Sequence, residues 1–393
     1  MNAKRLIIFS AVLIVVTAIT TFVLTTALNA VMFGYGINIA PAINNSKIDK
    51  TIRLIQDAYY LEPNKDKLID GAVAGLVAAL DDPYSAYMSK EEYAQFDTII
   101  SGKYSGIGVT VTADIKDKRI LVVAPIEGTP ADKAGIKTGD KILKVDGEDV
   151  WSDQLDSAVV KMKGKEGTSV SLDVLKADTG ETKTISIVRE SIRLETVRSE
   201  VKENNIGYIR ITTFDKETGD DFIKEIDSLK SKNIAGLILD LRGNPGGLVD
   251  MAQKVADVFL GDAVVTYLED RAGKREYVNA SGDSYDIPLV VLIDEGSASA
   301  SEIVAGALRD HQKAKLVGAK SFGKGLVQSL FPLDDGSYVK LTIARYFTPN
   351  GEDINKLGIK PDYEVQMPTA DGTKVLTEKE DTQLQKALEL LKK

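Results

Sequence analysis

A run of apolar residues, a turn of small residues and a helical pattern follow one another between positions 288 and 310. The apolar run occupies residues 288–293, the turn covers residues 296–300, and the helical pattern opens at Ser301. This order predicts a buried strand that leads directly into the N-terminus of a helix. Unpaired backbone N–H groups and the positive end of the helix dipole would then face any oxyanion that formed beside the turn.

The turn contains a candidate nucleophile, Ser299, and the candidate base is Lys324, which stands between two glycines. Ser297 and Ser301 lie close to Ser299, so spacing alone does not choose among the three serines. Ser299 and Glu302 also fit the Ser-x-x-Glu pattern of a capping box, in which the serine would only cap the helix. The residues by themselves therefore leave the role of Ser299 open.

Composition restricts the chemistry that is available to such a site. The chain has no cysteine, which excludes thiol catalysis, thiolate zinc sites and disulfides. Its single histidine, His311, excludes His-rich metal sites and would lie about 18 Å from Ser299 along one helix. A base near Ser299 must then be a lysine or a carboxylate. We expect no cofactor and no metal, and a net charge of −9 without a basic block argues against nucleic acid as a partner.

Lys324 can act as a base only as a neutral amine, because the ordinary lysine pKa of about 10.4 leaves little of that form at neutral pH. Phe322 and residues 326–327 are apolar neighbours in the sequence. They predict burial of the lysine side chain, which would lower its pKa.

Residues 318–324 support a competing hypothesis, because they match the Gly-x-x-x-x-Gly-Lys start of a phosphate-binding loop. However, Gly325 occupies the position where a serine or threonine should bind magnesium. Residues 326–330 also predict a strand where that loop requires a helix. An ATPase or GTPase is therefore the weaker hypothesis.

Strand and helix patterns alternate from residue 206 onward. Strands are expected at residues 206–211, 236–241, 289–293, 315–317 and 338–344, and helices at residues 216–232, 248–260 and 299–310. This alternation predicts a mixed α/β domain over residues 191–370, with a mainly parallel sheet covered by helices. The turns at 240–247 and 296–300 both follow strands, so we expect them to meet at the carboxyl edge of the sheet, where ligands bind.

A chain of 393 residues is too long for one compact core, and three further regions surround this domain. Residues 46–102 predict an N-terminal helical region, and residues 371–393 predict a C-terminal helix. Residues 103–190 predict the order β-β-α-β-α-β-β, with glycine-containing stretches at 104–109 and 135–147. This β-rich region resembles a PDZ domain inserted before the α/β domain.

The PDZ resemblance implies a peptide-binding loop made by Gly106, Ile107, Gly108 and Val109. Backbone N–H groups of such a loop hold a terminal carboxylate, while the peptide adds a strand to the edge of the sheet. Ile107 and Val109 are expected to line the groove. Arg119 and Arg189 are the arginines of the region, so we expect the carboxylate to depend mainly on backbone N–H groups.

Residues 6–28 carry no charge and follow Lys4 and Arg5. A span of this length can cross the bilayer core of about 30 Å, and the preceding positive charges favour translocation of everything downstream. We predict a signal anchor within residues 1–30 and a linker over residues 31–45. A cleaved signal peptide is the alternative, although residues 25–27 offer only a poor cleavage site. The expected location is the cell membrane, single-pass, with the catalytic part outside the cytoplasm.

These segments together resemble the carboxy-terminal processing peptidases, or tail-specific proteases, which are serine endopeptidases with a Ser/Lys dyad and an inserted PDZ domain. The resemblance covers roughly residues 46–366 and is carried by stretches at 80–84, 104–109, 135–147, 240–247, 296–303, 322–328, 346–351 and 358–361. It implies that Ser299 is the nucleophile, that Lys324 is its base, and that Gln328 holds the lysine amine. Because four strand residues span about 13 Å, the last contact needs a turn or a bulge, which Gly325 permits.

The same resemblance implies an oxyanion hole made by the N–H groups of Ala300 and of a glycine at 246–247, with Gly246 as the expected donor. It also implies a protein or peptide substrate with a free C-terminus, and it leaves room for a homodimer. A non-catalytic PDZ scaffold or adaptor at the membrane is the alternative from a different functional class.

Overall fold

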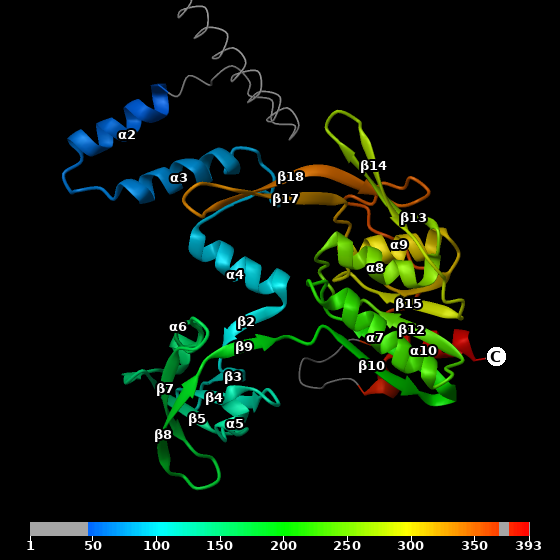
Figure 1. Ribbon diagram of the computed structural model, residues 1–393, viewed down its shortest axis with the longest axis horizontal. Helices are drawn as coiled ribbons and strands as arrows, with labels where there is room; N and C mark the ends of the chain where they lie inside the picture. The colour runs from blue at the N-terminus through cyan, green and yellow to red at the C-terminus, as the bar shows by residue number, and fades with distance from the viewer. Residues whose placement is uncertain (1–45, 369–376, 393) are drawn as a thin grey trace, which may run out of the picture. The chain divides into compact units, whose positions relative to one another are not determined.

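The structure is a computed structural model that describes residues 46–368 and 377–392 (Figure 1). It divides into two compact units, Met1–Leu76 and Val77–Lys393. In the first unit the described part consists of α2 (Ser46–Ala58) and most of α3 (Lys65–Ala78), as the helical pattern predicts. The predicted membrane span at residues 6–28 lies outside the described residues. Among the residues that are described, no helix has the length and apolar character that crossing a bilayer requires.

The second unit is built around a six-stranded sheet that carries the turns of interest. Its strand order is β10-β11-β12-β15-β16-β19, with bounds Val197–Lys202, Ile206–Ile211, Gly236–Asp240, Leu289–Ile293, Ala314–Gly318 and Tyr363–Glu364. All neighbouring strands are parallel except β10, which pairs antiparallel with β11 at the edge. Every residue of β12 and β15 is buried, because helices cover both faces of the sheet. The predicted parallel sheet is therefore confirmed.

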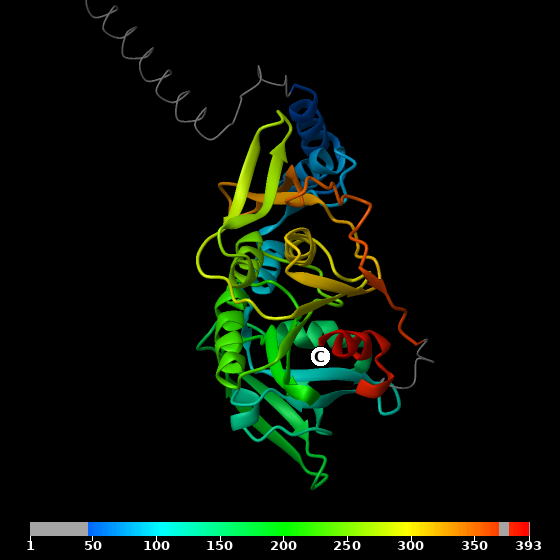
Figure 2. The same ribbon diagram turned by 90° about the vertical axis from the view of Figure 1, so that its right-hand side faces the viewer.

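Helices cover the two faces of this sheet unequally (Figures 1 and 2). The main hydrophobic core lies between the sheet and three helices, α7 (Thr218–Ser231), α8 (Val249–Leu260) and α9 (Ala300–Asp310). A smaller core on the opposite face is closed by α10 (Thr382–Leu391) with its apolar residues Leu384, Ala387, Leu388 and Leu391. The C-terminal helix is thus an integral layer of the domain rather than a charged tail.

A second, antiparallel sheet lies beside the first and was only partly predicted. It contains β1 (Ala86–Met88), β18 (Tyr338–Phe347), β13 (Ala263–Asp270) and β14 (Arg275–Ala280) in that order, and β17 (Leu326–Pro332) also pairs with β18. The sequence pattern indicates strands at 326–330 and 338–344 but gives no signal for β13 and β14. The helix that follows β1, α4 (Lys90–Ser101), begins with a capping box between Ser89 and Glu92.

Residues 103–193 form a β-rich region that ends three residues later than the predicted boundary at 190. Its sheet contains β3 (Val109–Asp114), β4 (Arg119–Pro125), β5 (Lys141–Val145), β6 (Glu148–Asp149), β7 (Ser169–Leu175) and β8 (Thr182–Val188). Two short helices, α5 (Pro130–Lys133) and α6 (Leu155–Met162), pack against it around a separate core. A two-stranded ribbon of β2 (Lys103–Gly106) and β9 (Glu190–Arg193) carries the chain into and out of this region.

Candidate active site

A cleft of about 370 Å³ brings the candidate residues of the two sheets together. The turn at the end of β12, the turn before α9 and the loop before β17 all reach it. Its lining residues are Phe96, Ile100, Thr213, Pro245, Gly246, Gly247, Leu248, Val249, Ser299, Lys324, Leu326, Val327, Gln328, Ser329, Leu330, Lys340 and Tyr346. Ser299, Lys324, Gln328 and Gly246, which the sequence analysis singles out, therefore share one cavity.

Ser299 is distinguished from its two neighbouring serines by its backbone and by its access to the cleft. It adopts φ 54° and ψ −114°, a conformation that a residue with a side chain rarely takes and that occurs often at functional sites. Ser297 and Ser301 are fully buried, and their hydroxyls donate to the carbonyls of Leu241 and Asn244 at 2.8 and 3.0 Å. Of the three serines, Ser299 is the one whose side chain faces the cleft.

Glu302 is a buried carboxylate that connects the serine turn with the lysine loop. Its Oε2 accepts the backbone N–H groups of Ser299 and Lys324, both at 2.9 Å. Its Oε1 accepts the Ser321 hydroxyl at 2.6 Å and the Gly323 N–H at 2.7 Å. The side chain is 1% exposed, so these hydrogen bonds are protected from water. Glu302 fixes the backbones that carry both candidate catalytic residues, whereas the sequence pattern identifies it only as a helix cap.

Lys324 lies partly buried in the cleft, and its surroundings favour the neutral amine. Burial lowers the pKa of Lys324, the positive charge of Lys340 lowers it further, and the carboxylate of Glu302 opposes both effects. Its Nζ also lies 5.1 Å from the centre of the Tyr84 ring. The expected direction of the pKa shift is confirmed, but one expected cause is wrong. Phe322 is 57% exposed and does not line the cleft, so Leu326, Val327 and Tyr346 form the apolar wall instead.

Gln328 lines the same cleft, and its described hydrogen bond goes to a different partner from the one expected. Its side-chain Nε2 donates to the Thr342 hydroxyl at 3.4 Å. The pairing of β17 with β18 shifts register between Val327 and Gln328, which is the local irregularity that a contact with Lys324 requires. Among the described residues no hydrogen bond joins Gln328 to Lys324, so that contact stays a prediction.

The two glycines at the end of β12 differ in what their N–H groups do. The Gly246 N–H donates to Asn244 Oδ1 at 2.9 Å, so the expected assignment of this group as an oxyanion donor is not supported. Within the described part of the chain, the N–H groups of Gly247 and of the fully buried Ala300 donate to no acceptor. An unpaired buried N–H group such as that of Ala300 is uncommon and calls for a functional explanation. Gly247 is exposed and lines the cleft, and its N–H has no acceptor among the described residues, so Gly247 replaces Gly246 as the candidate partner of Ala300.

Gly246 nevertheless has a clear steric role. At its φ of 100°, a Cβ atom would lie 2.7 Å from the Cβ of Ser299 and 3.0 Å from the Ala300 nitrogen. Only glycine allows the two turns to approach this closely. The turn after β12 thus packs directly against the candidate nucleophile.

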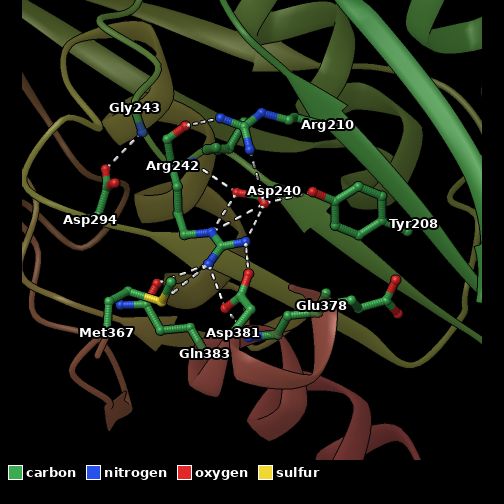
Figure 3. Close-up of polar contacts among 12 residues, drawn as sticks. Tyr208, Arg210, Asp240, Arg242, Gly243, Asp294, Met367, Glu378, Asp381 and Gln383 are labelled. Atoms are coloured by element: carbon green, nitrogen blue, oxygen red, sulfur yellow. Dashed lines mark hydrogen bonds and ion pairs between the residues drawn. The ribbon is translucent and has the colours of Figure 1, made fainter. Parts of the chain in front are cut away.

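A buried polar network anchors that turn to the C-terminal helix (Figure 3). Arg242 donates from Nη1 and Nη2 to the two carboxylate oxygens of Asp381, both at 2.9 Å, and from Nη2 to Asp240 at 2.7 Å. The guanidinium also contacts Gln383 Oε1 at 3.1 Å. Next to it, Asp294 accepts the Gly243 N–H at 2.8 Å. Residues of α10 therefore help to set the position of the backbone that continues into Gly246 and Gly247.

His311 lies outside this site. It follows the last residue of α9, at the opposite end of the helix from Ser299, and its Nε2 lies 2.7 Å from the Val264 carbonyl.

Residues 318–324 do not form a phosphate-binding loop. They run into a strand, β17, and the N–H groups of Gly323 and Lys324 already donate to Glu302. They are consequently not available to cradle a phosphate. The ATPase or GTPase hypothesis is wrong.

A second cavity, of about 300 Å³, adjoins the expected peptide-binding loop at 106–109. Ile107 and Val109 line it as predicted, together with Val159 and Met162 of the α6 helix. Neither Ile107 nor Gly108 donates its N–H to another described residue. Arg189 is buried and donates to the Met162, Ser169 and Lys161 carbonyls, so it is not free to bind a ligand. Lys163, which sequence reasoning missed, lines the cavity and supplies a cation there.

Protein-family models and proteins of similar sequence match most of this chain. The model for Peptidase family S41 matches residues 205–365, that for the activating protease CtpB N-terminal domain matches residues 37–92, and a PDZ domain model matches residues 121–176. The carboxy-terminal processing protease CtpA of Bacillus subtilis is 44% identical over 82% of this chain and 69% of its own length. A carboxyl-terminal-processing protease of Synechocystis is 37% identical over 89% of this chain and 84% of its own length.

A solved structure shares the fold. The putative S41 protease from Bacteroides fragilis is 19% identical, superposes with a TM-score of 0.53, and covers 90% of this chain and 98% of its own. The sequence relatives and the family model confirm the resemblance that the motifs suggest and favour a peptidase over a non-catalytic scaffold. The chain belongs to Peptidase family S41 and is a serine-type peptidase that contains a PDZ domain.

Proposed function

We propose that this protein is a carboxy-terminal processing endopeptidase in which Ser299 and Lys324 form a catalytic dyad. The observation that carries the proposal is the shared cleft, where a serine in a strained backbone conformation accompanies a lysine whose pKa is lowered by burial. A lysine that is neutral at working pH can accept the serine proton, and Ser-Lys pairs are a known variant of triad chemistry. His311 has no access to this cleft, which leaves the lysine as the base.

The reaction is an acyl transfer in two steps. Lys324 takes the proton of the Ser299 hydroxyl while the oxygen attacks the carbonyl carbon of the scissile bond. The resulting ammonium then protonates the departing amine as the C–N bond breaks. Water, activated by the same lysine, hydrolyses the ester that remains on Ser299. The free N–H groups of Ala300 and Gly247 are our candidates for stabilising the oxyanion in both steps.

The PDZ domain would deliver substrates by their C-terminal ends. The unengaged N–H groups of Ile107 and Gly108 suit a terminal carboxylate, and Lys163 adds a positive charge beside them. The apolar walls at Val109, Val159 and Met162 suit the side chain of the last residue. Cleavage should therefore slow when the substrate tail is amidated. Equal cleavage of amidated and free tails, under conditions of limiting substrate, would remove tail recognition from the proposal.

The enzyme would act outside the cytoplasm from a membrane anchor at residues 6–28. The uncharged span and the preceding Lys4 and Arg5 carry this part of the proposal. Full-length protein should fractionate with membranes and be open to protease from the extracytoplasmic side. A soluble extracytoplasmic protein that begins near Asn29 would mean that the segment is a cleaved signal. A homodimer remains a further prediction, which light scattering on detergent-solubilised protein tests.

Labelling with a serine-reactive phosphonate tests the dyad directly. The wild-type protein should react at Ser299, and the Ser299→Ala variant should neither react nor cleave while keeping its thermal unfolding temperature. Modification of Ser297 or Ser301 instead, or cleavage by the Ser299→Ala variant, would contradict the assignment. A folded wild-type protein that neither reacts nor cleaves any peptide would point back to a scaffold.

A further inference from the structure

The cleft that holds Ser299 and Lys324 contains a second lysine, Lys340. It lies on β18, where it pairs with Ala86 of β1 and with Leu330 of β17. Its side chain is partly buried, and its Nζ lies 5.4 Å from the centre of the Phe96 ring, which lines the same cleft. The position of Lys340 is therefore set by pairing on both sides of β18, and its ammonium group is held at the wall of the active-site cleft.

Among the described residues, the ammonium group of Lys340 is in no ion pair, although its charge acts on the carboxylate of Asp82 at longer range. Asp82 accepts hydrogen bonds from the Ser85 hydroxyl at 2.6 Å and from the Tyr84 N–H at 3.1 Å. A partly buried cation without a directly bonded carboxylate is well placed to bind an anionic group of a ligand.

Lys340 is the main source of charge among the side chains that line the cleft. None of the described residues that line it is an aspartate or a glutamate. Lys324 must be neutral to act as a base, so Lys340 is then the one charged side chain among the described residues that line the cleft. The carboxylates of Glu302 and Asp82, whose charges reach the two lysines, do not line it. A cation in an apolar, partly water-excluded cavity attracts anionic groups more strongly than a surface lysine does.

We propose that Lys340 binds a carboxylate of the substrate, so that this peptidase prefers peptides in which a carboxylate occupies the cleft close to the scissile bond. The inference rests on the proposed function of the Ser299 cleft and adds a substrate class to it. The carboxylate can come from an aspartate or glutamate side chain or from a free C-terminus a few residues from the cut. Lysine serves as a point charge for either source, because its three N–H donors do not demand a planar partner.

A matched set of peptides tests the inference with the full-length enzyme. All peptides share one cleavable sequence, and at each position flanking the scissile bond they carry either glutamate or glutamine, with the C-terminus free or amidated. The readout is the ratio of kcat/KM for the two members of each pair. A ratio is used because any effect of Lys340 on the protonation of Lys324 acts on both members equally and cancels.

We expect wild-type enzyme to favour the carboxylate member about tenfold at one or more positions, as a charge-assisted hydrogen bond in a partly buried site predicts. The Lys340→Met variant should reduce this ratio to about one, and Lys340→Arg should keep most of it. Lys315→Met is the matched control, because Lys315 is exposed on β16 and does not line the cleft. If the preference for the carboxylate peptide persists when the peptide C-terminus is amidated, the acidic side chain is the carboxylate that Lys340 binds. If amidation removes the preference, Lys340 binds the terminal carboxylate.

The PDZ domain also responds to a free C-terminus, so the comparison of wild type with Lys340→Met isolates the contribution of the cleft. Amidation effects that are equal in the two enzymes belong to the PDZ domain and overturn the terminal-carboxylate source. Ratios near one in the wild type, or a preference that Lys340→Met leaves intact, overturn the inference while the cleavage itself upholds the proposed function. Absence of both cleavage and phosphonate labelling would overturn the two together.

Discussion

The carboxylate of Glu302 lies 2.9 Å from the backbone nitrogen of Lys324, although 22 residues separate them in the sequence. The same oxygen accepts the N–H of Ser299 at 2.9 Å. One buried side chain therefore sets the relative positions of the proposed nucleophile and the proposed base through their backbones, without bonding to either reactive group. We describe Glu302 as a positioning residue, and two substitutions separate its geometric role from its charge.

Glu302→Ala should lower kcat by about 100-fold, because it leaves four backbone and side-chain donors without an acceptor and loosens the Lys324 loop. Glu302→Gln keeps the shape but removes the negative charge, which opposes the lowering of the Lys324 pKa. The pH–rate profile of this variant should shift to lower pH even if kcat falls. A profile that stays in place while activity falls would reduce Glu302 to a purely structural residue.

Activity should rise with pH through a single ionisation that lies below the ordinary lysine pKa of about 10.4. The direction of this pH dependence follows from the chemistry of Lys324. Burial and the positive charge of Lys340 lower the pKa of Lys324, and only its neutral amine can accept the proton of the Ser299 hydroxyl. Removing that charge with Lys340→Met should move the ionisation of kcat/KM to higher pH. The control is Lys315→Met, which should leave it unchanged. An activity that falls through the same range would contradict a neutral lysine base.

Lys324→Arg should be as inactive as Lys324→Ala, because a guanidinium stays protonated at every pH at which the protein is folded. His311→Ala should keep at least half of the wild-type kcat, since its ring contacts the Val264 carbonyl at the far end of α9. Circular dichroism and thermal unfolding establish that each variant is folded. Activity in Lys324→Arg, or a folded but inactive His311→Ala, would transfer the role of base to another group.

Asp381→Asn should destabilise the protein by about 2 kcal/mol at neutral pH, because it breaks the paired hydrogen bonds to Arg242. Burial by itself would raise the pKa of Asp381, but its hydrogen bonds to Arg242 outweigh that effect and lower it. A carboxyl group whose pKa is lower in the folded than in the unfolded protein stabilises the folded state at pH values above its unfolded-state pKa of about 3.9. This stabilisation is lost as the pH falls below that value.

The difference between wild type and Asp381→Asn in urea unfolding should consequently shrink below about pH 4. Asp178→Asn is a suitable control, because Asp178 pairs with Lys137 on the exposed surface of the PDZ domain, where an ion pair contributes little to stability. We also expect Asp381→Asn to lower kcat, since Arg242 anchors the backbone that leads to Gly246 and Gly247. Unchanged stability with unchanged kcat would mean that the network is dispensable.

The parallel sheet could be predicted because its central strands are almost entirely apolar and bounded by turn residues. β12 and β15 are buried on both faces, so β15 is an uninterrupted hydrophobic run and β12 is apolar up to its last residue, Asp240. β13 and β14 give no such signal, since they are partly exposed and carry charged residues such as Glu269 and Arg275 at their ends. Tertiary pairing with β18, rather than local preference, makes β13 a strand.

The residues of the candidate site could be predicted where a sequence motif contains them, but contacts between distant segments could not. Ser299 and Lys324 belong to recognisable stretches, whereas the partners of Glu302 at Ser321, Gly323 and Tyr346 become neighbours only in the fold. The Gly246 N–H is different, because an asparagine two residues earlier commonly accepts such a group and the sequence contains that signal. Lys340 has no distinguishing pattern, and only the shape of the cleft reveals it.

The contact between Arg242 and Asp381 also bears on when the enzyme becomes active during its synthesis. A ribosome releases the segments that hold Ser299 and Lys324 well before it releases residues 381–383. Until those residues emerge, Arg242 lacks two of its acceptors and α10 cannot cover its face of the sheet. We therefore expect the nascent polypeptide to remain an unassembled peptidase during translation, which keeps its cutting activity away from neighbouring unfolded chains until its own folding is complete.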